Sequence, residues 1–222
     1  MLGHKFMLPT PFEALGKILA FGFYSPKWER VQFPNINAVG HLEAEAFEPE
    51  RWKSDYPNPA FMSRLPDDEY WGAKQVMAFT DDDIRSIVEL GQFSDARAVD
   101  YLTATLAERR DKIGRTLFSK LLPFDNFHVE NGTLRFDDLA AKYNFRSVEP
   151  YTLRWTRFDN DTGRHQVLVG TSTKLPYDTE EAPAGAYFAA LIKTTTMPAQ
   201  SVTAYLRKER DGLRVVGIER TW

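Results

Sequence analysis

Apolar side chains recur at helical spacing through the first half of the chain and in short β-type runs in the second half. Three helical stretches are predicted, over residues 67–78, 80–90 and 94–120, and each opens with acidic or hydroxyl side chains. Such side chains accept hydrogen bonds from the free N–H groups of a first helical turn and suit its positive dipole end. From residue 151 onward, β-branched and aromatic runs alternate with turn sequences. The pattern predicts an α+β protein, helical first and antiparallel β afterwards.

A further short helix is predicted near the N-terminus, over residues 10–21. Thr10 would cap it, and Pro11 would occupy the first helical position. Between residues 25 and 69, six prolines interrupt regular structure while large aromatic residues recur. A flexible linker would not retain so many rings, so we expect an ordered segment that wraps around the helices.

Two β-hairpins are predicted in the second half. They pair residues 151–158 with 164–169 and residues 202–208 with 213–218, and Gly212 supplies a positive φ in the second turn. The bridging region 124–143 is expected to hold a small hairpin at Asn131-Gly132 and a short helix from Asp137. We therefore expect two domains, a helical one over residues 1–122 and an antiparallel, sandwich-like β-domain over residues 123–222.

Composition narrows the classes of protein that this chain can belong to. Its 222 residues are 43% hydrophobic and 14% aromatic, which excludes disorder over most of the length. A net charge of -3 lacks the positive field that nucleic-acid binding requires, so no nucleic-acid partner is expected. The absence of cysteine excludes disulfides, thiolate nucleophiles and iron–sulfur clusters. Ile18–Tyr24, the longest apolar stretch near the start, is too short to span a membrane.

Recognisable catalytic motifs are missing. There is no nucleophile elbow, no phosphate-binding P-loop and no dinucleotide fingerprint, so a non-enzymatic role without a cofactor is favoured. Asp81–Asp83 could bind a hard cation, but these aspartates suit a helix N-terminus better. Asp159–Gly163 contains half of a calcium loop, and a plain hairpin turn explains it better. We expect no metal site.

Four residues are candidates for contacting a ligand or a partner. Arg109 and Arg110 concentrate positive charge on a helix, where guanidinium groups could bind phosphate or carboxylate, although pairing with nearby acidic residues is the stronger interpretation. Tyr187 and Tyr205 lie on the opposite faces of their strands from the apolar residues, where exposed rings could stack on sugars. Trp155 is expected in the core.

Several short motifs resemble the C-terminal part of a group of large uncharacterised bacterial proteins. They are FEPERWK at 47–53, YPNPAF at 56–61, DDIR at 82–85 and RRDKIG at 109–114. The resemblance spans residues 15–222. The longer proteins have a kinase-like region upstream, and many look exported. The resemblance implies that residues 1–122 include part of a kinase-like C-lobe and that residues 123–222 form an appended β-domain. No kinase motif occurs in this chain, so the resemblance implies no catalytic residue here.

Three functional hypotheses follow. The first is a non-catalytic C-terminal module that packs with or positions a kinase-like polypeptide, supplied upstream or in trans. The second is a stand-alone glycan-binding protein that uses the β-domain. The third is a hydrolase with carboxylates and His128 or His165 converging between the two halves.

The N-terminal apolar residues carry a further expectation. The short helix and its following loop cannot hide all of this apolar area, so we expect self-association through the helical half. The residues that supply the area are Leu15, Ile18, Leu19, Phe21 and Phe23, together with Val31 and Phe33. Localisation stays open: it is cytoplasmic if Met1 is the true start, and periplasmic or exported if the chain belongs to a longer precursor.

Overall fold

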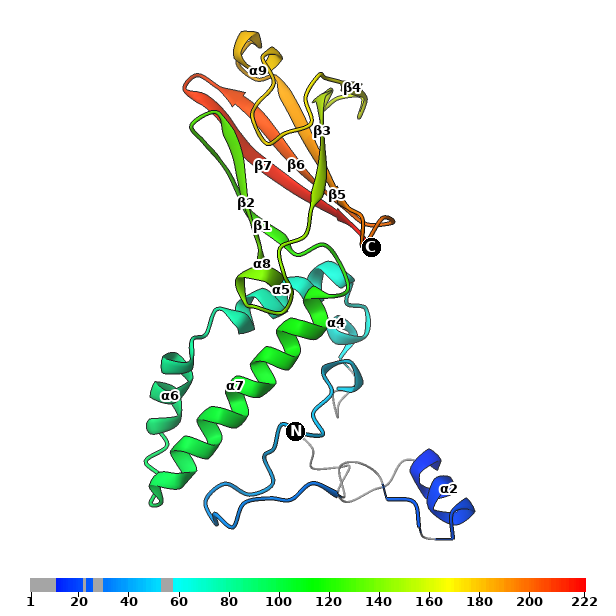
Figure 1. Cartoon of the computed structure of the whole chain (residues 1–222), viewed down its shortest axis with the longest axis vertical. Helices are drawn as coiled ribbons and strands as arrows, with labels where there is room; N and C mark the ends of the chain where they lie inside the picture. The colour runs from blue at the N-terminus through cyan, green and yellow to red at the C-terminus, as the bar shows by residue number, and fades with distance from the viewer. Residues whose placement is uncertain (1–10, 22, 26–29, 53–57) are drawn as a thin grey trace. The chain divides into compact units, whose positions relative to one another are not determined.

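A computed structural model describes residues 11–21, 23–25, 30–52 and 58–222 (Figure 1). In the described residues the chain is α+β, as predicted, with antiparallel sheets that follow most of the helices. It divides into two compact units. The helical unit contains the described residues up to Arg64 together with Gly72–Thr116, and the β-unit contains Leu65–Trp71 together with Leu117–Trp222. No helix among the described residues is both long enough and apolar enough to cross a membrane.

The helices agree closely with the sequence prediction. They are α2 (Pro11–Leu19), the 3-10 helix η1 (Pro49–Arg51), α4 (Pro59–Met62), α5 (Pro66–Met77), α6 (Asp81–Glu89) and α7 (Ala96–Phe118). The predicted cap Thr10 lies outside the described residues. Within the described part of the proline-rich segment between α2 and α5, the structure has the short helices η1 and α4.

The start of α6 is set by a capping box. The Thr80 hydroxyl accepts a hydrogen bond from the Asp83 backbone N–H at 3.1 Å, and the Thr80 N–H donates to the Asp83 carboxylate at 2.9 Å. Two orphan N–H groups are thereby satisfied at once. Further along α6, Ile84 and Val88 pack with Leu102 of α7 in a small apolar cluster.

Helix α7 holds part of the wrapping segment through its side chains. The Tyr101 hydroxyl donates to the carbonyl of Leu42 at 2.9 Å, and Arg109 Nε donates to the carbonyl of Glu43 at 2.5 Å. Lys112 Nζ donates to the next two carbonyls, those of residues 44 and 45. Four successive carbonyls in a segment without regular structure are therefore satisfied by one helix, and this part of the expected wrapping segment is ordered.

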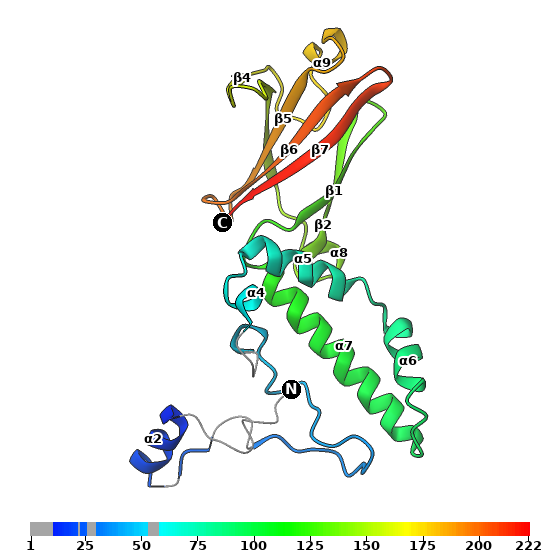
Figure 2. The same cartoon turned by 180° about the vertical axis from the view of Figure 1, so that it is seen from behind.

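The β-unit contains two antiparallel sheets (Figure 2). Its elements are β1 (Phe124–Glu130), β2 (Thr133–Asp138), α8 (Leu139–Lys142), β3 (Tyr151–Phe158), β4 (His165–Val167), α9 (Asp178–Glu181), β5 (Tyr187–Thr194), β6 (Ser201–Glu209) and β7 (Gly212–Thr221). Strands β1 and β2 form a hairpin, and the five-stranded sheet has the order β4-β3-β5-β6-β7. The predicted hairpins β3–β4 and β6–β7 are both present, and β5 separates them.

Turn chemistry accounts for the tight connections. Asn131 and Gly132 both have positive φ, 49° and 68°, which suits the right-handed twist of the β1–β2 hairpin. Gly212 has a φ of 149°, the positive value expected there. The short helix α8 begins at Leu139, two residues later than predicted, because Asp138 is its cap. Asp137 instead accepts hydrogen bonds from Asn126 and Lys142.

The main core lies between the β1–β2 hairpin and one face of the five-stranded sheet. Its fully buried members include Phe124, Leu134, Phe188, Ile192 and Trp155. The indole N–H of Trp155 donates to the carbonyl of Ser172 at 2.9 Å, so its one polar atom is satisfied. The expectation that Trp155 belongs to the core is confirmed.

A buried polar cluster joins the first turns of α5 to the sheets within the β-unit. The Tyr70 hydroxyl donates to Asp125 Oδ2 at 3.1 Å, and Arg220 Nη2 donates to the carbonyl of Phe124 at 2.8 Å. Arg220 Nη2 also lies 3.8 Å from Asp125 Oδ1, and the guanidinium carbon lies 4.3 Å from the centroid of the Tyr70 ring. Burial raises the pKa of Tyr70 well above its usual value, so its phenol stays a neutral donor.

Candidate functional site

The face of the five-stranded sheet opposite the β1–β2 hairpin carries an ordered row of functional side chains. We call it the outer face. Cross-strand pairing links His165 to Phe158, Phe158 to Tyr187, Tyr187 to Arg207, and Arg207 to Arg214. These five residues, one from each strand, form a line of three rings followed by two cations, which we call the ring–arginine row.

The small side chain of Ala189 lets two rings from non-adjacent strands meet on the outer face. Phe158 on β3 and Tyr205 on β6 are separated by β5, a backbone spacing of roughly 10 Å. Their ring centroids are nevertheless 4.9 Å apart, because the buried Ala189 of β5 leaves room for both rings to lean over it. The His165 ring lies 4.9 Å from the Phe158 ring and 6.5 Å from the Tyr205 ring, so all three rings are neighbours. The result is an aromatic cluster that spans four strands.

Hydrogen bonds hold the cluster in place. The Tyr205 hydroxyl donates to Glu219 Oε2 at 2.6 Å, and His165 Nδ1 lies 2.9 Å from the hydroxyl oxygen of Thr156. Burial, reinforced by the bond to the Glu219 carboxylate, raises the pKa of Tyr205 to about 12. Tyr205 is therefore a neutral donor at physiological pH, and its ring orientation is set before any ligand arrives.

Cations flank the aromatic cluster. The Arg207 guanidinium lies 5.9 Å from the centroid of the Tyr187 ring, and it forms an ion pair with Glu209 at 3.3 Å. Arg214 on β7 stands directly opposite Arg207, and Arg154 and Lys193 lie toward the other end of the outer face. Within the described part of the chain, the charged side-chain groups of Arg154, Lys193 and Arg214 form neither hydrogen bonds nor ion pairs.

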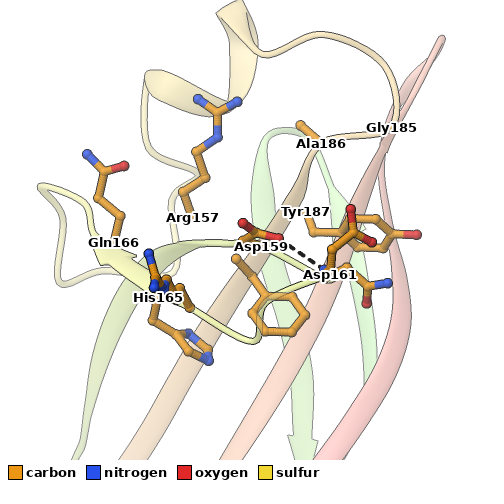
Figure 3. A pocket seen from close by; sticks show the side chains of 11 residues that line it. Arg157, Asp159, Asp161, His165, Gln166, Gly185, Ala186 and Tyr187 are labelled. Atoms are coloured by element: carbon orange, nitrogen blue, oxygen red, sulfur yellow. Dashed lines mark hydrogen bonds between the residues drawn. The ribbon is translucent and has the colours of Figure 1, made fainter.

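A shallow pocket of about 720 Å³ opens at the β3–β4 turn and the start of β5 (Figure 3). Phe158, His165 and Tyr187 line it, so it adjoins the ring–arginine row. Figure 3 shows Arg157 and His165 projecting to opposite sides of the hairpin. The pocket therefore extends the outer face around the end of the sheet.

Two of the four candidates from the sequence lie on this face. Tyr187 and Tyr205 are partly buried, and the register makes them diagonal neighbours, because Tyr205 pairs with Ala189. Their expected position opposite the core is confirmed. The role of both residues in ligand binding stays a prediction.

The other two candidates, Arg109 and Arg110, are engaged inside the helical unit. The Arg109 guanidinium carbon lies 4.8 Å from the centroid of the Phe47 ring, in addition to the bond that Arg109 donates to the Glu43 carbonyl. Arg110 pairs with Asp81 at 2.7 Å and Asp111 at 2.8 Å. These contacts agree with the pairing interpretation, and a ligand role for the two arginines stays a prediction.

The acidic motifs have structural partners. Asp83 belongs to the capping box of α6, and Asp81 pairs with Arg110. Asp159 Oδ1 accepts bonds from the backbone N–H groups of Asp161 and Thr162, as in an ordinary turn. Among the residues that the structure describes, no group of three His, Asp or Glu side chains could hold a metal ion.

Sequence reasoning missed Phe158, His165, Arg207, Arg214 and Glu219 as parts of one surface. Alternation along each strand assigns these residues to a face. It does not say which strands are neighbours, and the row exists only because β5 lies between β3 and β6.

No family model matches this sequence, and neither curated proteins nor solved structures show detectable similarity to it. The resemblance to the C-terminal part of large bacterial proteins therefore stays a prediction. The function must be argued from the site itself.

Proposed function

We propose that this chain is a binding module and that its outer face binds an extended glycan. The observation that carries the proposal is the pre-positioned aromatic cluster of Phe158, His165 and Tyr205, with Tyr187 beside it. Rings held in place by packing and hydrogen bonds lose little entropy when a ligand stacks on them.

The polar residues around the rings suit sugars. Sugar hydroxyls both donate and accept hydrogen bonds, and the outer face offers hydroxyls at Thr152 and Thr203 and a carboxylate at Glu219. The C–H faces of a pyranose can pack on Tyr187 and Tyr205, while the ring hydroxyls reach these polar groups. A surface that alternates apolar and polar groups in this way fits a carbohydrate better than a purely apolar partner.

The same face is poorly suited to cleaving a glycan. On the strands of this face, the described carboxylates are Glu209 and Glu219, which are separated by six residues along the β6 register, roughly 20 Å. Glycoside hydrolysis needs two carboxyl groups about 5–10 Å apart. We therefore propose binding without hydrolysis at this face.

A glycan array probed with purified protein tests the proposal. Tyr205→Ala and Tyr187→Ala are each expected to weaken binding about tenfold or more, because each removes a stacking ring. Tyr177→Ala is the control, because the Tyr177 hydroxyl, like that of Tyr205, donates to a glutamate, at 2.7 Å, but Tyr177 is exposed and lies next to α9. Absence of glycan binding, or equal binding by all three variants, would refute the proposal.

A second candidate function, packing against a kinase-like polypeptide, rests on α2. Phe12, Ile18 and Leu19 are 87%, 72% and 70% exposed, which leaves an apolar surface available for a partner. The reading frame upstream of Met1 provides a test. Nucleotide-site motifs encoded there would support this function, and an unrelated, well-separated gene would count against it.

A further inference from the structure

We infer that the glycan is acidic and that Arg207 and Arg214 bind its carboxylate or sulfate groups. This inference rests on the proposed function and adds the chemical class of the ligand.

Arg207 and Arg214 are directly opposite each other on neighbouring strands. Like charges in this arrangement repel, so the pair lowers the stability of the sheet unless something neutralises it. Glu209 pairs with Arg207, at 3.3 Å, and both side chains are more than a third exposed, so solvent screens that contact. Arg214 has no ion-pair partner among the described residues. One anion bound between the two guanidinium groups would satisfy both, because each presents paired N–H donors that match a carboxylate or a sulfate.

The arginine pair is placed where a stacked sugar would present such a group. Tyr187 is the direct neighbour of Arg207 in the ring–arginine row, one strand spacing or roughly 5 Å away. A pyranose lying on Tyr187 and Tyr205 can therefore extend an acidic substituent over Arg207 without leaving the rings. The next residue of the row, Arg214, then lies on the far side of that substituent.

The net charge of the outer face is positive, opposite in sign to that of an acidic glycan. It carries four cations, Arg154, Lys193, Arg207 and Arg214, against the two carboxylates Glu209 and Glu219. Both carboxylates already have partners, whereas the whole chain has a net charge of -3. An anionic polymer would therefore be drawn to this face rather than to the rest of the surface.

The distribution of these cations favours an acidic glycan over single-stranded nucleic acid. The cation-free second row, with Val167, Thr156, Ala189, Tyr205 and Gly217, separates the two groups of cations. A nucleic-acid backbone has a phosphate at every nucleotide and needs a continuous positive track. In addition, the Glu219 carboxylate lies beside the rings, where it would repel phosphates but can accept hydrogen bonds from sugar hydroxyls.

The test is an array on which each uronic-acid or sulfated glycan is printed beside its methyl-esterified or desulfated form. The wild-type protein is expected to bind the acidic members about tenfold or more tightly than their neutral counterparts. Arg207→Gln and Arg214→Gln should each remove most of that preference. Arg210→Gln is the matched control, because Arg210 is an exposed arginine in the β6–β7 turn, and it should bind like the wild type. Without ligand, Arg214→Gln should also raise the urea midpoint of unfolding, because the repulsion is gone.

The outcomes separate this inference from the proposed function. Equal binding of acidic and neutral glycans, lost in Tyr205→Ala but kept in Arg214→Gln, would overturn the acidic ligand and leave the glycan site standing. Binding of poly(U) or poly(dT) in place of glycans, lost in the arginine variants, would overturn both in favour of nucleic acid. Failure to bind any printed glycan would overturn the proposed function and this inference with it.

Discussion

Replacing Arg220 by methionine should be among the most damaging single changes in the β-unit. The Arg220 and Asp125 side chains are only 11% and 9% exposed, so the charges have little contact with water. Removing the Arg220 cation leaves the buried Asp125 carboxylate without its opposite charge. Breaking a buried ion pair in this way costs about 3–5 kcal/mol. Methionine keeps the apolar stem that packs beside Tyr70 and removes only the charged group.

The contacts place the loss toward the lower end of that range. Asp125 keeps the hydrogen bonds from the Tyr70 hydroxyl and the Asn126 N–H, and Nη2 of Arg220 is 3.8 Å away, beyond hydrogen-bond distance. The carbonyl of Phe124 also loses its donor, which adds about 1 kcal/mol. We therefore expect Arg220→Met to lower the free energy of unfolding of the β-unit by about 4 kcal/mol.

Urea unfolding of the full chain, followed by the ¹⁹F signal of 5-fluorotryptophan at Trp155, reports on the β-unit because Trp155 is fully buried in its core. The control is Arg214→Met on the same strand, which is exposed and should change stability by less than about 1 kcal/mol. Adding Asp125→Asn to Arg220→Met should recover about 2 kcal/mol, because the buried negative charge that Arg220 balanced is then removed as well. A loss below about 1 kcal/mol for Arg220→Met, or strictly additive effects of the two substitutions, would show that the charges do not interact as described.

Two further predictions concern the outer face and α2. The folded-state pKa of Tyr205, about 12, lies above the unfolded value near 10, so the contribution of the Tyr205–Glu219 bond to stability should be complete below pH 10 and lost as the pH rises toward 12. Urea midpoints across this range should fall more steeply for the wild type than for Tyr205→Phe, and parallel curves would contradict the assignment. The exposed apolar side chains of α2 should drive self-association, which Leu19→Glu should reduce in light scattering. A wild-type protein that stays monomeric over a wide concentration range would rule this out.

Local signals in the sequence predicted most of the elements but not their long-range pairing. The Thr80 cap, the Asn131-Gly132 turn and the buried Trp155 each depend on residues close by or on a strong preference of one side chain. Even local signals can miss by a position. The positive φ after α6 is at Gln92, 46°, and not at Gly91, although glycine adopts such a φ more readily.

The candidate site was predicted only in part, because it is assembled across strands. Tyr187 and Tyr205 could be assigned to the face opposite the core from the two-residue repeat of a strand. Their neighbours could not be assigned. Arg214 faces Arg207 because of the β6–β7 register, and Phe158 reaches Tyr205 only because the intervening residue of β5 is alanine. Register depends on the whole sheet and its bulges, which no single window of sequence contains.

The hydrogen bonds from α7 side chains to the carbonyls of residues 42–45 have a consequence for amide exchange. In this segment a fixed position and slow amide exchange, which usually occur together, need not coincide. Side chains of α7 satisfy the four carbonyls of this segment, but none of its four backbone N–H groups has a hydrogen-bond acceptor among the described residues. Amide protons exchange with solvent when they lack such an acceptor, whatever holds the carbonyls. Glu43 and Ala44 are also buried, which slows the exchange of their amide protons. The exposed Glu45 can exchange its amide proton rapidly while the segment stays ordered, so rapid exchange there would not mean that the segment moves.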